Sequence, residues 1–277
     1  MKLSYRWFAL ITPLLCCVAM AAPMPKDKEK EPEGKKVDSG SFGIFQNGHR
    51  VGTETFSIYE TGNGSVIKSE FKTENTPPDV QSSEMQLAAN GDIRRYEWKE
   101  LSPERGESVL LPNDDFLTQK WRASPQEKEH EQPYLLPLST TILDDYFFID
   151  REILAWRFLA SACKQDKGVL QCPLRQRAQF GTINPHQHSS APLAMESLGR
   201  EMLSLKNGPR DLIKLELKTD AGAWQLWIDD QNLWRVMRML VEGENTVWSA
   251  IKLQASGIKH MAAKQKISET EDLKPDI

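Results

Sequence analysis

Two histidines lie close enough in the sequence to bind one metal ion. They occur in the segment Pro185-His186-Gln187-His188, and residues two positions apart share one face of a β-strand. A zinc site needs three or four ligands, and neither an HExxH motif nor a third histidine or cysteine stands nearby. The surrounding stretch GTINPHQHSSAP is polar. We therefore expect an exposed loop and no metal ion here, with His186 and His188 as the candidate ligands should a metal bind.

Other residue types that carry catalysis form no convincing motif. The chain lacks the Gly-x-Ser-x-Gly pattern of a nucleophilic serine. Adjacent aspartates occur three times, at Asp114-Asp115, Asp144-Asp145 and Asp229-Asp230. The first and third pairs have the composition of turns, and a glycosidase needs two carboxyl groups that face each other across a cleft. We expect a non-enzymatic protein without a cofactor. The less favoured alternative, a metal-dependent hydrolase, requires the two histidines above to converge on a third ligand.

Two cysteines remain for chemistry once the first residues are set aside. Cys163 and Cys172 are nine positions apart, with the turn-forming Asp166-Lys167-Gly168 between them. This spacing predicts a disulfide across a hairpin, which would stabilise the fold by about 2–3 kcal/mol in the loop-entropy model. A redox pair is the alternative, but such pairs are usually Cys-x-x-Cys at the start of a helix.

Three tryptophans gather in the late segment WQLWIDDQNLWRVMRML. Trp224 shares one strand face with Leu226 and Ile228, which places Trp227 on the other face, where we expect it to be partly exposed. Exposed aromatic side chains can line a ligand groove or a partner surface. Trp224, Trp227 and Trp234 are therefore the candidate ligand-binding residues. The alternative is an ordinary cross-strand aromatic pair beside a long side chain.

The first residues have the pattern of a signal peptide. Lys2 and Arg6 precede the apolar stretch WFALITPLLCCV, and Ala19-Met20-Ala21 supplies a cleavage site, which predicts a signal peptide over residues 1–21. The whole apolar region, residues 7–22, is 16 residues long, whereas a membrane-spanning helix needs about 20. An uncleaved anchor and a lipidated cysteine at position 16 or 17 are the alternatives. We expect a periplasmic or secreted protein without a membrane span after cleavage.

Composition limits the partners and divides the mature chain. Signal removal changes the formal charge from −4 to −6, and the scattered lysines and arginines form no basic stripe, which argues against nucleic acid. Residues 22–38 are rich in proline and charge, and we expect a disordered linker there. Residues 39–263 then form a single β-rich domain, and residues 264–277 a disordered tail.

The domain alternates strand and turn signals around one helix. Asn47-Gly48 between alternating apolar runs predicts a hairpin, and further turns occur at residues 62–64 and 90–92. Residues 142–160 (ILDDYFFIDREILAWRFLA) have the apolar period of a helix, which Thr141 would cap and Asp144-Asp145 would favour at its positive end. We predict a mainly β protein with one main helix, in which a curved antiparallel sheet or half-barrel wraps around that apolar helix.

The order of these elements resembles a known class. The opening GIFQNGHRVGTETFSI, the meander, the apolar helix and the late tryptophan-rich pair are similar to exported bacterial proteins of unknown function with a curved, open β-barrel fold. Their architecture is similar to that of the periplasmic lipoprotein carriers. The large apolar side chains of residues 142–160 and of the tryptophan-rich late strands should face one another, and from them we expect an envelope protein that binds a lipid or another hydrophobic small molecule in the concave face of the sheet. A structural or protein-interaction module of the envelope, with an envelope protein as its partner, is the alternative.

Overall fold

The computed structural model describes residues 33–255, apart from residues 104, 138, 167–168, 206–207, 221 and 243–246. The predicted signal peptide and the C-terminal tail lie outside the described residues. No helix in the described part of the chain is long and apolar enough to cross a membrane.

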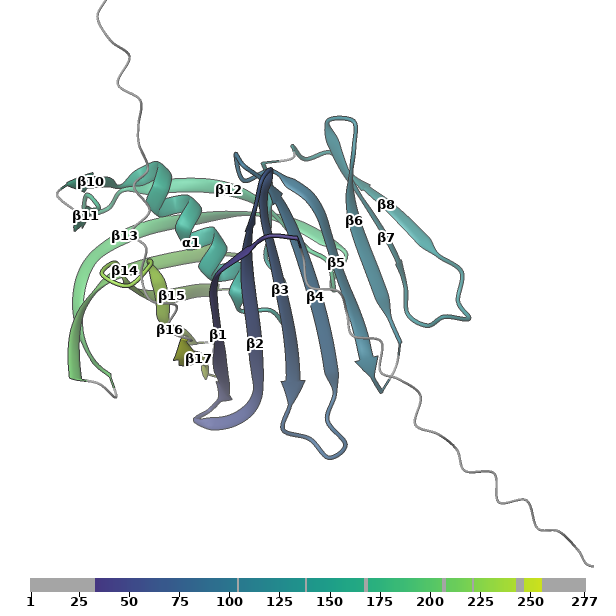
Figure 1. Cartoon of the computed structure of the whole chain (residues 1–277), viewed down its shortest axis with the longest axis horizontal. Coiled ribbons are helices and arrows are strands. Elements are labelled where there is room, and N and C mark those ends of the chain that lie inside the picture. The colour runs from purple at the N-terminus through teal and green to yellow at the C-terminus, as the bar shows by residue number, and fades with distance from the viewer. Residues whose placement is uncertain are drawn as a thin grey trace, which may run out of the picture. The chain divides into compact units, whose positions relative to one another are not determined.

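One 15-stranded sheet dominates the described domain (Figure 1). Its first half runs in chain order as β1 (Lys35–Gln46), β2 (His49–Thr61), β3 (Gly64–Thr73), β4 (Val80–Ala88), β5 (Ile93–Ser102), β6 (Glu107–Asn113), β7 (Phe116–Arg122) and β8 (His130–Tyr134). Its second half comprises β9 (Thr141–Ile142), β12 (Arg177–Asn184), β13 (Ser189–Leu205), β14 (Gly208–Thr219), β15 (Gly222–Asp229), β16 (Arg235–Glu242) and β17 (Val247–Ala255). The helix α1 (Ile149–Ala162) and the small hairpin β10 (Lys164–Asp166) and β11 (Val169–Gln171) lie between the halves in sequence.

The two halves join through β1 and β17, which pair antiparallel. The sheet order is β8-β7-β6-β5-β4-β3-β2-β1-β17-β16-β15-β14-β13-β12-β9, so the strands at its two ends do not pair with each other. Every pair is antiparallel except β9 with β12. The predicted fold class is confirmed: the protein is mostly β with one helix, and the large curved sheet is not closed into a barrel.

Turn chemistry sets the register of the first hairpins. Asn47 and Gly48 have φ angles of 49° and 80°, the left-handed pair that a two-residue turn between β1 and β2 requires. Burial then alternates along β3, where Ile67, Ser69 and Phe71 face inward and their neighbours do not. The first strand begins at Lys35, so the last four residues of the predicted disordered linker belong to the sheet. Asp38, one of those four, is 3% exposed.

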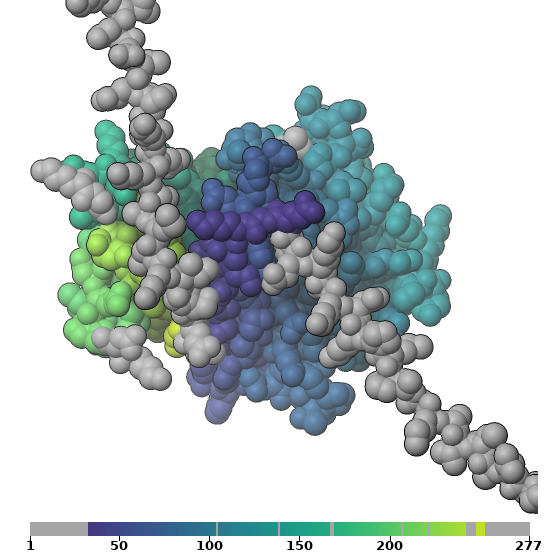
Figure 2. All heavy atoms as spheres, in the orientation of Figure 1, coloured from purple at the N-terminus to yellow at the C-terminus, as the bar shows by residue number. Residues whose placement is uncertain are grey.

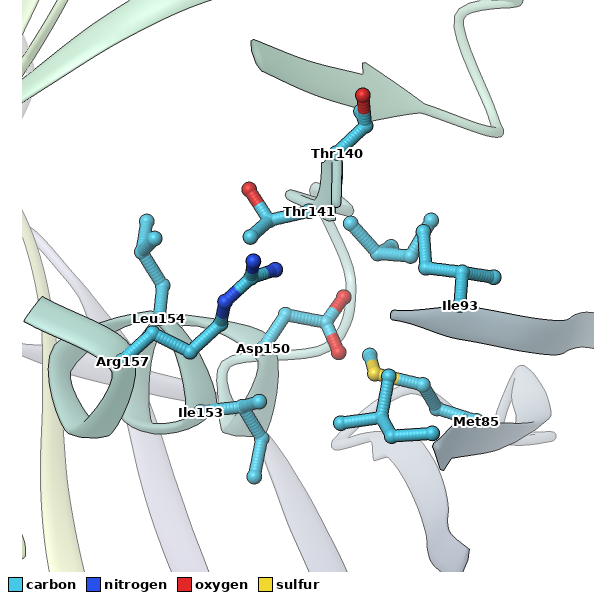
Figure 3. Close-up of a pocket in the computed structure, with 10 residues that line it drawn as sticks. Met85, Ile93, Thr140, Thr141, Asp150, Ile153, Leu154 and Arg157 are labelled. Atoms are coloured by element: carbon cyan, nitrogen blue, oxygen red, sulfur yellow. The ribbon is translucent and has the colours of Figure 1, made fainter. Parts of the chain in front are cut away.

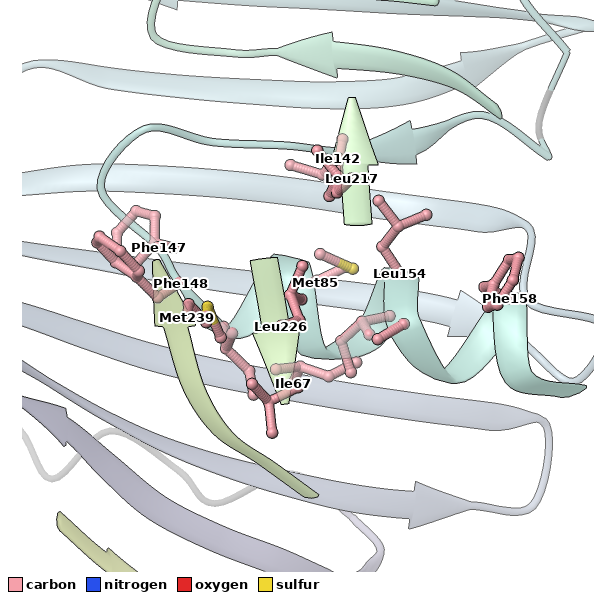
Figure 4. Packing of buried hydrophobic residues seen from close by; sticks show 14 of the residues in the cluster. Ile67, Met85, Ile142, Phe147, Phe148, Leu154, Phe158, Leu217, Leu226 and Met239 are labelled. Atoms are coloured by element: carbon pink, nitrogen blue, oxygen red, sulfur yellow. The ribbon is translucent and has the colours of Figure 1, made fainter. Parts of the chain in front are cut away.

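The helix α1 lies against the inner face of the sheet, between its two halves (Figure 1). Ile149, Leu154 and Phe158 of the helix are at most 1% exposed. They join one hydrophobic core with side chains from both halves, among them Ile67 and Leu226 (Figure 4). This burial of a helix that is apolar around much of its surface agrees with the expectation from sequence.

The start of the helix differs from the prediction. The helix begins at Ile149 and not at residue 142, because Thr141 and Ile142 form β9 and pair with β12. Thr141 does not cap the helix: its hydroxyl donates to the carbonyl oxygen of Gly181 at 3.2 Å. Asp144 therefore lies in the connection before the helix.

On the face shown in Figure 2, the side chains of the first half of the sheet (purple to teal) lie beside those of the second half (green to yellow). Both halves thus contribute to one continuous body in the part of the chain that the structure describes.

Candidate functional site

An apolar groove of about 460 Å³ runs beside α1. Its sheet wall comes from β1 to β4, its helix wall from α1, and one rim from the turn between β15 and β16. Three of its apolar lining residues, Ile58, Ile67 and Ile153, are buried. The other lining residues are Val37, Asp38, Ser65, Leu87, Ala89, Asn90, Gly91, Trp156, Arg157, Ala160, Leu233 and Trp234. The volume lies within the range of about 300–1,000 Å³ that is usual for small-molecule sites.

The rim formed by the β15–β16 turn is tied to the helix. Trp156 on α1 donates its indole N–H to the carbonyl oxygen of Trp234 at 2.7 Å. Leu233 and Trp234 have φ angles of 58° and 56°, a left-handed conformation that is uncommon for large side chains. Leu233 is 48% exposed. A strained turn therefore presents a large apolar side chain at the mouth of the groove, a combination that is typical of functional sites.

Two charged side chains line the groove, and their surroundings differ. The Asp38 carboxylate is 3% exposed and accepts from the Arg235 guanidinium, whose Nε lies 3.1 Å from each carboxylate oxygen. Arg157 donates to the carbonyl oxygen of Ser139 at 2.9 Å. Burial lowers the pKa of Arg157, and attraction by Asp92 opposes that effect. Asp38 thus has a matched counter-ion, whereas Arg157 is partly desolvated beside a neutral carbonyl.

A small cavity of about 10 Å³ lies next to the groove. Figure 3 shows Asp150 and Arg157 of α1 facing it from one side and Thr140 and Met85 from others. Among the described residues, one carboxylate oxygen of Asp150 and the hydroxyl oxygen of Thr140 are buried and have no hydrogen-bond partner. A cavity of this size holds about one water molecule.

Buried carboxylates gather where α1 begins. Glu54 on β2 accepts the backbone N–H groups of Phe148 and Ile149 at 2.7 and 3.2 Å, and the Ser69 hydroxyl at 2.6 Å. It thereby caps the helix from a distant strand, since Phe148 provides no side-chain cap. Burial raises the pKa of Glu54 to about 7. Burial also raises the pKa of Asp150 well above its ordinary value, with Asp144 and Glu54 adding repulsion.

His186 joins this region from the β12–β13 turn. Its Nδ1 lies 2.7 Å from an Asp144 carboxylate oxygen, and its Nε2 lies 2.9 Å from the side-chain oxygen of Gln81. The ring stacks on Trp98 with centroids 4.0 Å apart. Both ring nitrogens thus contact protein oxygens, and the ring packs inside the molecule. Residues 185–188 form a turn between β12 and β13, as expected, and Gln187 is exposed. The expected exposure is wrong for His186, whose side chain is 13% exposed because it packs against Trp98.

His188 has different neighbours. Its ring stacks on Trp121 with centroids 4.1 Å apart, and burial lowers its pKa, as do His186 and His130. In the part of the chain that the structure describes, no three histidine, cysteine, aspartate or glutamate side chains are arranged to hold a metal ion. The two histidines bind separate aromatic partners instead of converging on one ligand.

The three candidate tryptophans occupy three different sites. Trp234 lines the groove, and Trp224 contacts Phe148 edge-on at 5.8 Å near the helix start. Trp227 is 3% exposed, so the expectation of partial exposure is wrong. Lys214 and Arg238 lie over its ring at 5.0 and 5.1 Å from the centroid and cover it. Of the three candidate tryptophans, Trp234 is therefore the one that lines the groove.

The remaining predicted features are structural. Cys163 and Cys172 form a disulfide beside the β10–β11 hairpin. Asp114 lies in the β6–β7 turn with a φ of 54°. Asp229 and Asp230 accept from Arg210 and Arg200, respectively. None of these aspartates lines the groove.

The groove residues from the helix and the early strands were not identified from the sequence. In the sequence, their apolar side chains have the pattern of ordinary core positions, and Arg157 has the pattern of a solvated charge within an apolar helix. The signal that could have found them is the small Ala160 one helical turn after Trp156 and Arg157.

Comparison with known proteins supports the fold. Neither a family model nor a curated protein matches the sequence. Among solved structures, the chain is similar to a protein from Brucella abortus described as a beta-barrel-like protein of domain of unknown function DUF1849. The TM-score is 0.50 at 8% identity, over 79% of this chain and 96% of that one. At this identity the likeness shows the fold alone, which agrees with the predicted resemblance to β-barrel-like proteins of unknown function.

Proposed function

We propose that this chain is an exported, non-enzymatic protein of the bacterial envelope that binds a hydrophobic ligand in the groove beside α1. The groove carries the proposal: an apolar strip bounded by β1 to β4 and the helix reaches the surface at Leu233. Each methylene group that a ligand buries there contributes about 0.8 kcal/mol. Reversible burial of an apolar chain is therefore the activity that this geometry supports best.

Export is supported by two features of the chain. The first 21 residues have the charge, apolar run and cleavage pattern of a signal peptide. The disulfide between Cys163 and Cys172 suits an oxidising compartment.

A structural or interaction module remains the second candidate, since the sheet ends in the strand β8. An end strand can pair with a partner chain. The sequence of β8, HEQPY, contains a proline and a charge, and Gln132 donates to the carbonyl oxygen of His188 at 3.2 Å. The proline and the charge both disfavour pairing of this edge strand with a partner strand. This composition favours the groove over the edge as the functional surface.

Native mass spectrometry of the protein purified from a bacterial periplasm tests the proposal. We expect a stoichiometric hydrophobic ligand that organic extraction removes and identifies. A mass equal to that of the chain alone, unchanged after incubation with phospholipids and fatty acids, would contradict it. The interaction module would then be tested by cross-linking in intact cells.

A further inference from the structure

Arg157 is the cation that the groove presents without a carboxylate partner. Within the described ranges, no carboxylate oxygen forms an ion pair with its guanidinium, and its hydrogen bond goes to the Ser139 carbonyl oxygen. Asp92 attracts it at longer range, but that carboxylate accepts from the Asn90 side chain at 2.8 Å. A partly desolvated guanidinium beside apolar walls is stabilised by an anion that can accept two parallel hydrogen bonds.

The other charge in the groove is already neutralised. Asp38 accepts from Arg235, and the Lys252 ammonium lies 3.9 Å away. An anionic group gains nothing at that end of the groove, where it would meet a buried carboxylate. The two ends of the groove therefore differ: Arg157 provides a cation without a carboxylate partner at one end, and Asp38 is an ion-paired carboxylate at the other.

The two ends are separated by the width of four strands. Asp38 lies on β1, and Arg157 packs against Gly91 in the turn that follows β4, where an added Cβ would meet the Arg157 Nε at 3.7 Å. The strands β1 to β4 are consecutive in the sheet and about 4.8 Å apart, which gives a separation of about 14 Å. Ile58, Ile67 and Leu87 form the apolar strip between these ends.

We propose, on the basis of the function inferred above, that the ligand is a single-chain amphiphile with a carboxylate head, as in a fatty acid. Its carboxylate accepts two hydrogen bonds from Arg157. Its chain crosses β4, β3 and β2 towards the rim at Leu233 and Trp234. One cation and one continuous apolar strip match one charge and one chain.

The test compares palmitate with hexadecanol, which has the same chain but a neutral head. Isothermal titration calorimetry measures both affinities at pH 8, below the aggregation concentration of each compound, on the purified chain after delipidation. We expect the wild-type protein to bind palmitate at least about tenfold more tightly, because a charge-assisted bidentate pair forms with the carboxylate alone.

Three variants test whether Arg157 causes this preference for palmitate and whether both ligands bind in the groove. Arg157→Gln removes it and leaves hexadecanol binding unchanged, whereas Arg157→Lys retains part of it because the charge remains. Ala160→Phe places a ring in the groove from an exposed helix position and weakens both ligands. Thermal unfolding checks that each variant is folded, and the lysine variant keeps the test valid should the glutamine variant lose stability.

The outcomes separate this inference from the proposed function. Equal affinities for the acid and the alcohol in the wild-type protein, or an unchanged preference in Arg157→Gln, would overturn the carboxylate assignment and leave the groove as a hydrophobic site. Absence of binding by both compounds, or binding that Ala160→Phe does not weaken, would overturn the groove itself.

Discussion

Replacing Glu54 by glutamine should change how stability depends on pH. The Glu54 carboxylate is fully buried on β2 and accepts three hydrogen bonds, two of them from the backbone at the start of α1. Glutamine has nearly the same shape, and its side-chain oxygen can still accept from the helix. The substitution therefore removes the titration and keeps most of the packing.

The size and sign follow from the pKa of Glu54, which burial raises from 4.5 to about 7. Between these two values the folded protein holds a proton that the unfolded chain has released. The free energy of unfolding therefore decreases as the pH rises through this window and is constant above it. At about 1.4 kcal/mol per pH unit, the decrease that Glu54 causes amounts to about 3 kcal/mol.

In Glu54→Gln this decrease is absent, so the variant should gain about 3 kcal/mol relative to wild type between pH 4.5 and pH 8. Urea unfolding followed by tryptophan fluorescence at several pH values measures the difference. Asp150 also titrates from a buried position in both proteins, and in the variant its pKa is raised less because the repulsion from Glu54 is absent. Glu70→Gln, at an exposed position on β3, is the matched control and should follow the wild-type pH profile.

A stability difference between wild type and Glu54→Gln that is the same at every pH would refute the reasoning. It would mean that Glu54 releases its proton at the same pH in the folded protein as in the unfolded chain, so that its three hydrogen bonds offset the effect of its burial.

Three further substitutions test how the helix and sheet are held. Lys252→Met should lower the free energy of unfolding by about 3–5 kcal/mol in urea titrations, since it leaves the buried Glu152 carboxylate without its cation, now at 2.9 Å. Gly64→Ala should lower the Tm by several degrees, because φ is +150° and an added Cβ would lie 1.9 Å from a backbone oxygen of the neighbouring strand. The same change two positions earlier, where an added Cβ meets nothing within 4 Å, should be nearly neutral. Replacing Cys163 and Cys172 by serine should cost about 2–3 kcal/mol, and a reducing agent should lower the wild-type protein to the same stability.

Local signals in the sequence were sufficient for the turns, the disulfide and the fold class. The Asn47-Gly48 turn needs a left-handed backbone that few residue pairs adopt easily, and the structure has it there. The two cysteines needed only a turn between them to meet. For the turns and the disulfide, the residues that determine the feature lie within about ten positions of one another.

The start of the helix and the position of His186 depended on distant partners. The cap of α1 is Glu54, which is 94 positions from Phe148 in the chain. His186 meets Gln81, which is 105 positions away. Its polar segment forms a turn, as the composition indicates, but contacts with Trp98, Asp144 and Gln81 cover most of the His186 side chain. Periodicity and composition do not carry information about such contacts.

The groove itself requires an explanation, since protein interiors usually pack without space of this size. A shift of α1 towards β1 to β4 would fill it, and three contacts oppose that shift. Glu54 holds the first turn of the helix, Lys252 of β17 holds Glu152, and the Trp156 indole is bonded to the rim at Trp234.

Each contact fixes the helix to a different part of the sheet: the first half, the central strand and the late turn. A helix fixed in this way loses little freedom when a ligand binds, and preorganisation of this kind increases affinity. The buried ion pair between Glu152 and Lys252 is therefore better explained by the position that it gives the helix than by its stability, because buried ion pairs often contribute little net free energy. Its loss should let the helix move into the groove, so that a Lys252→Met protein that remains folded binds hydrophobic ligands more weakly than the wild-type protein does.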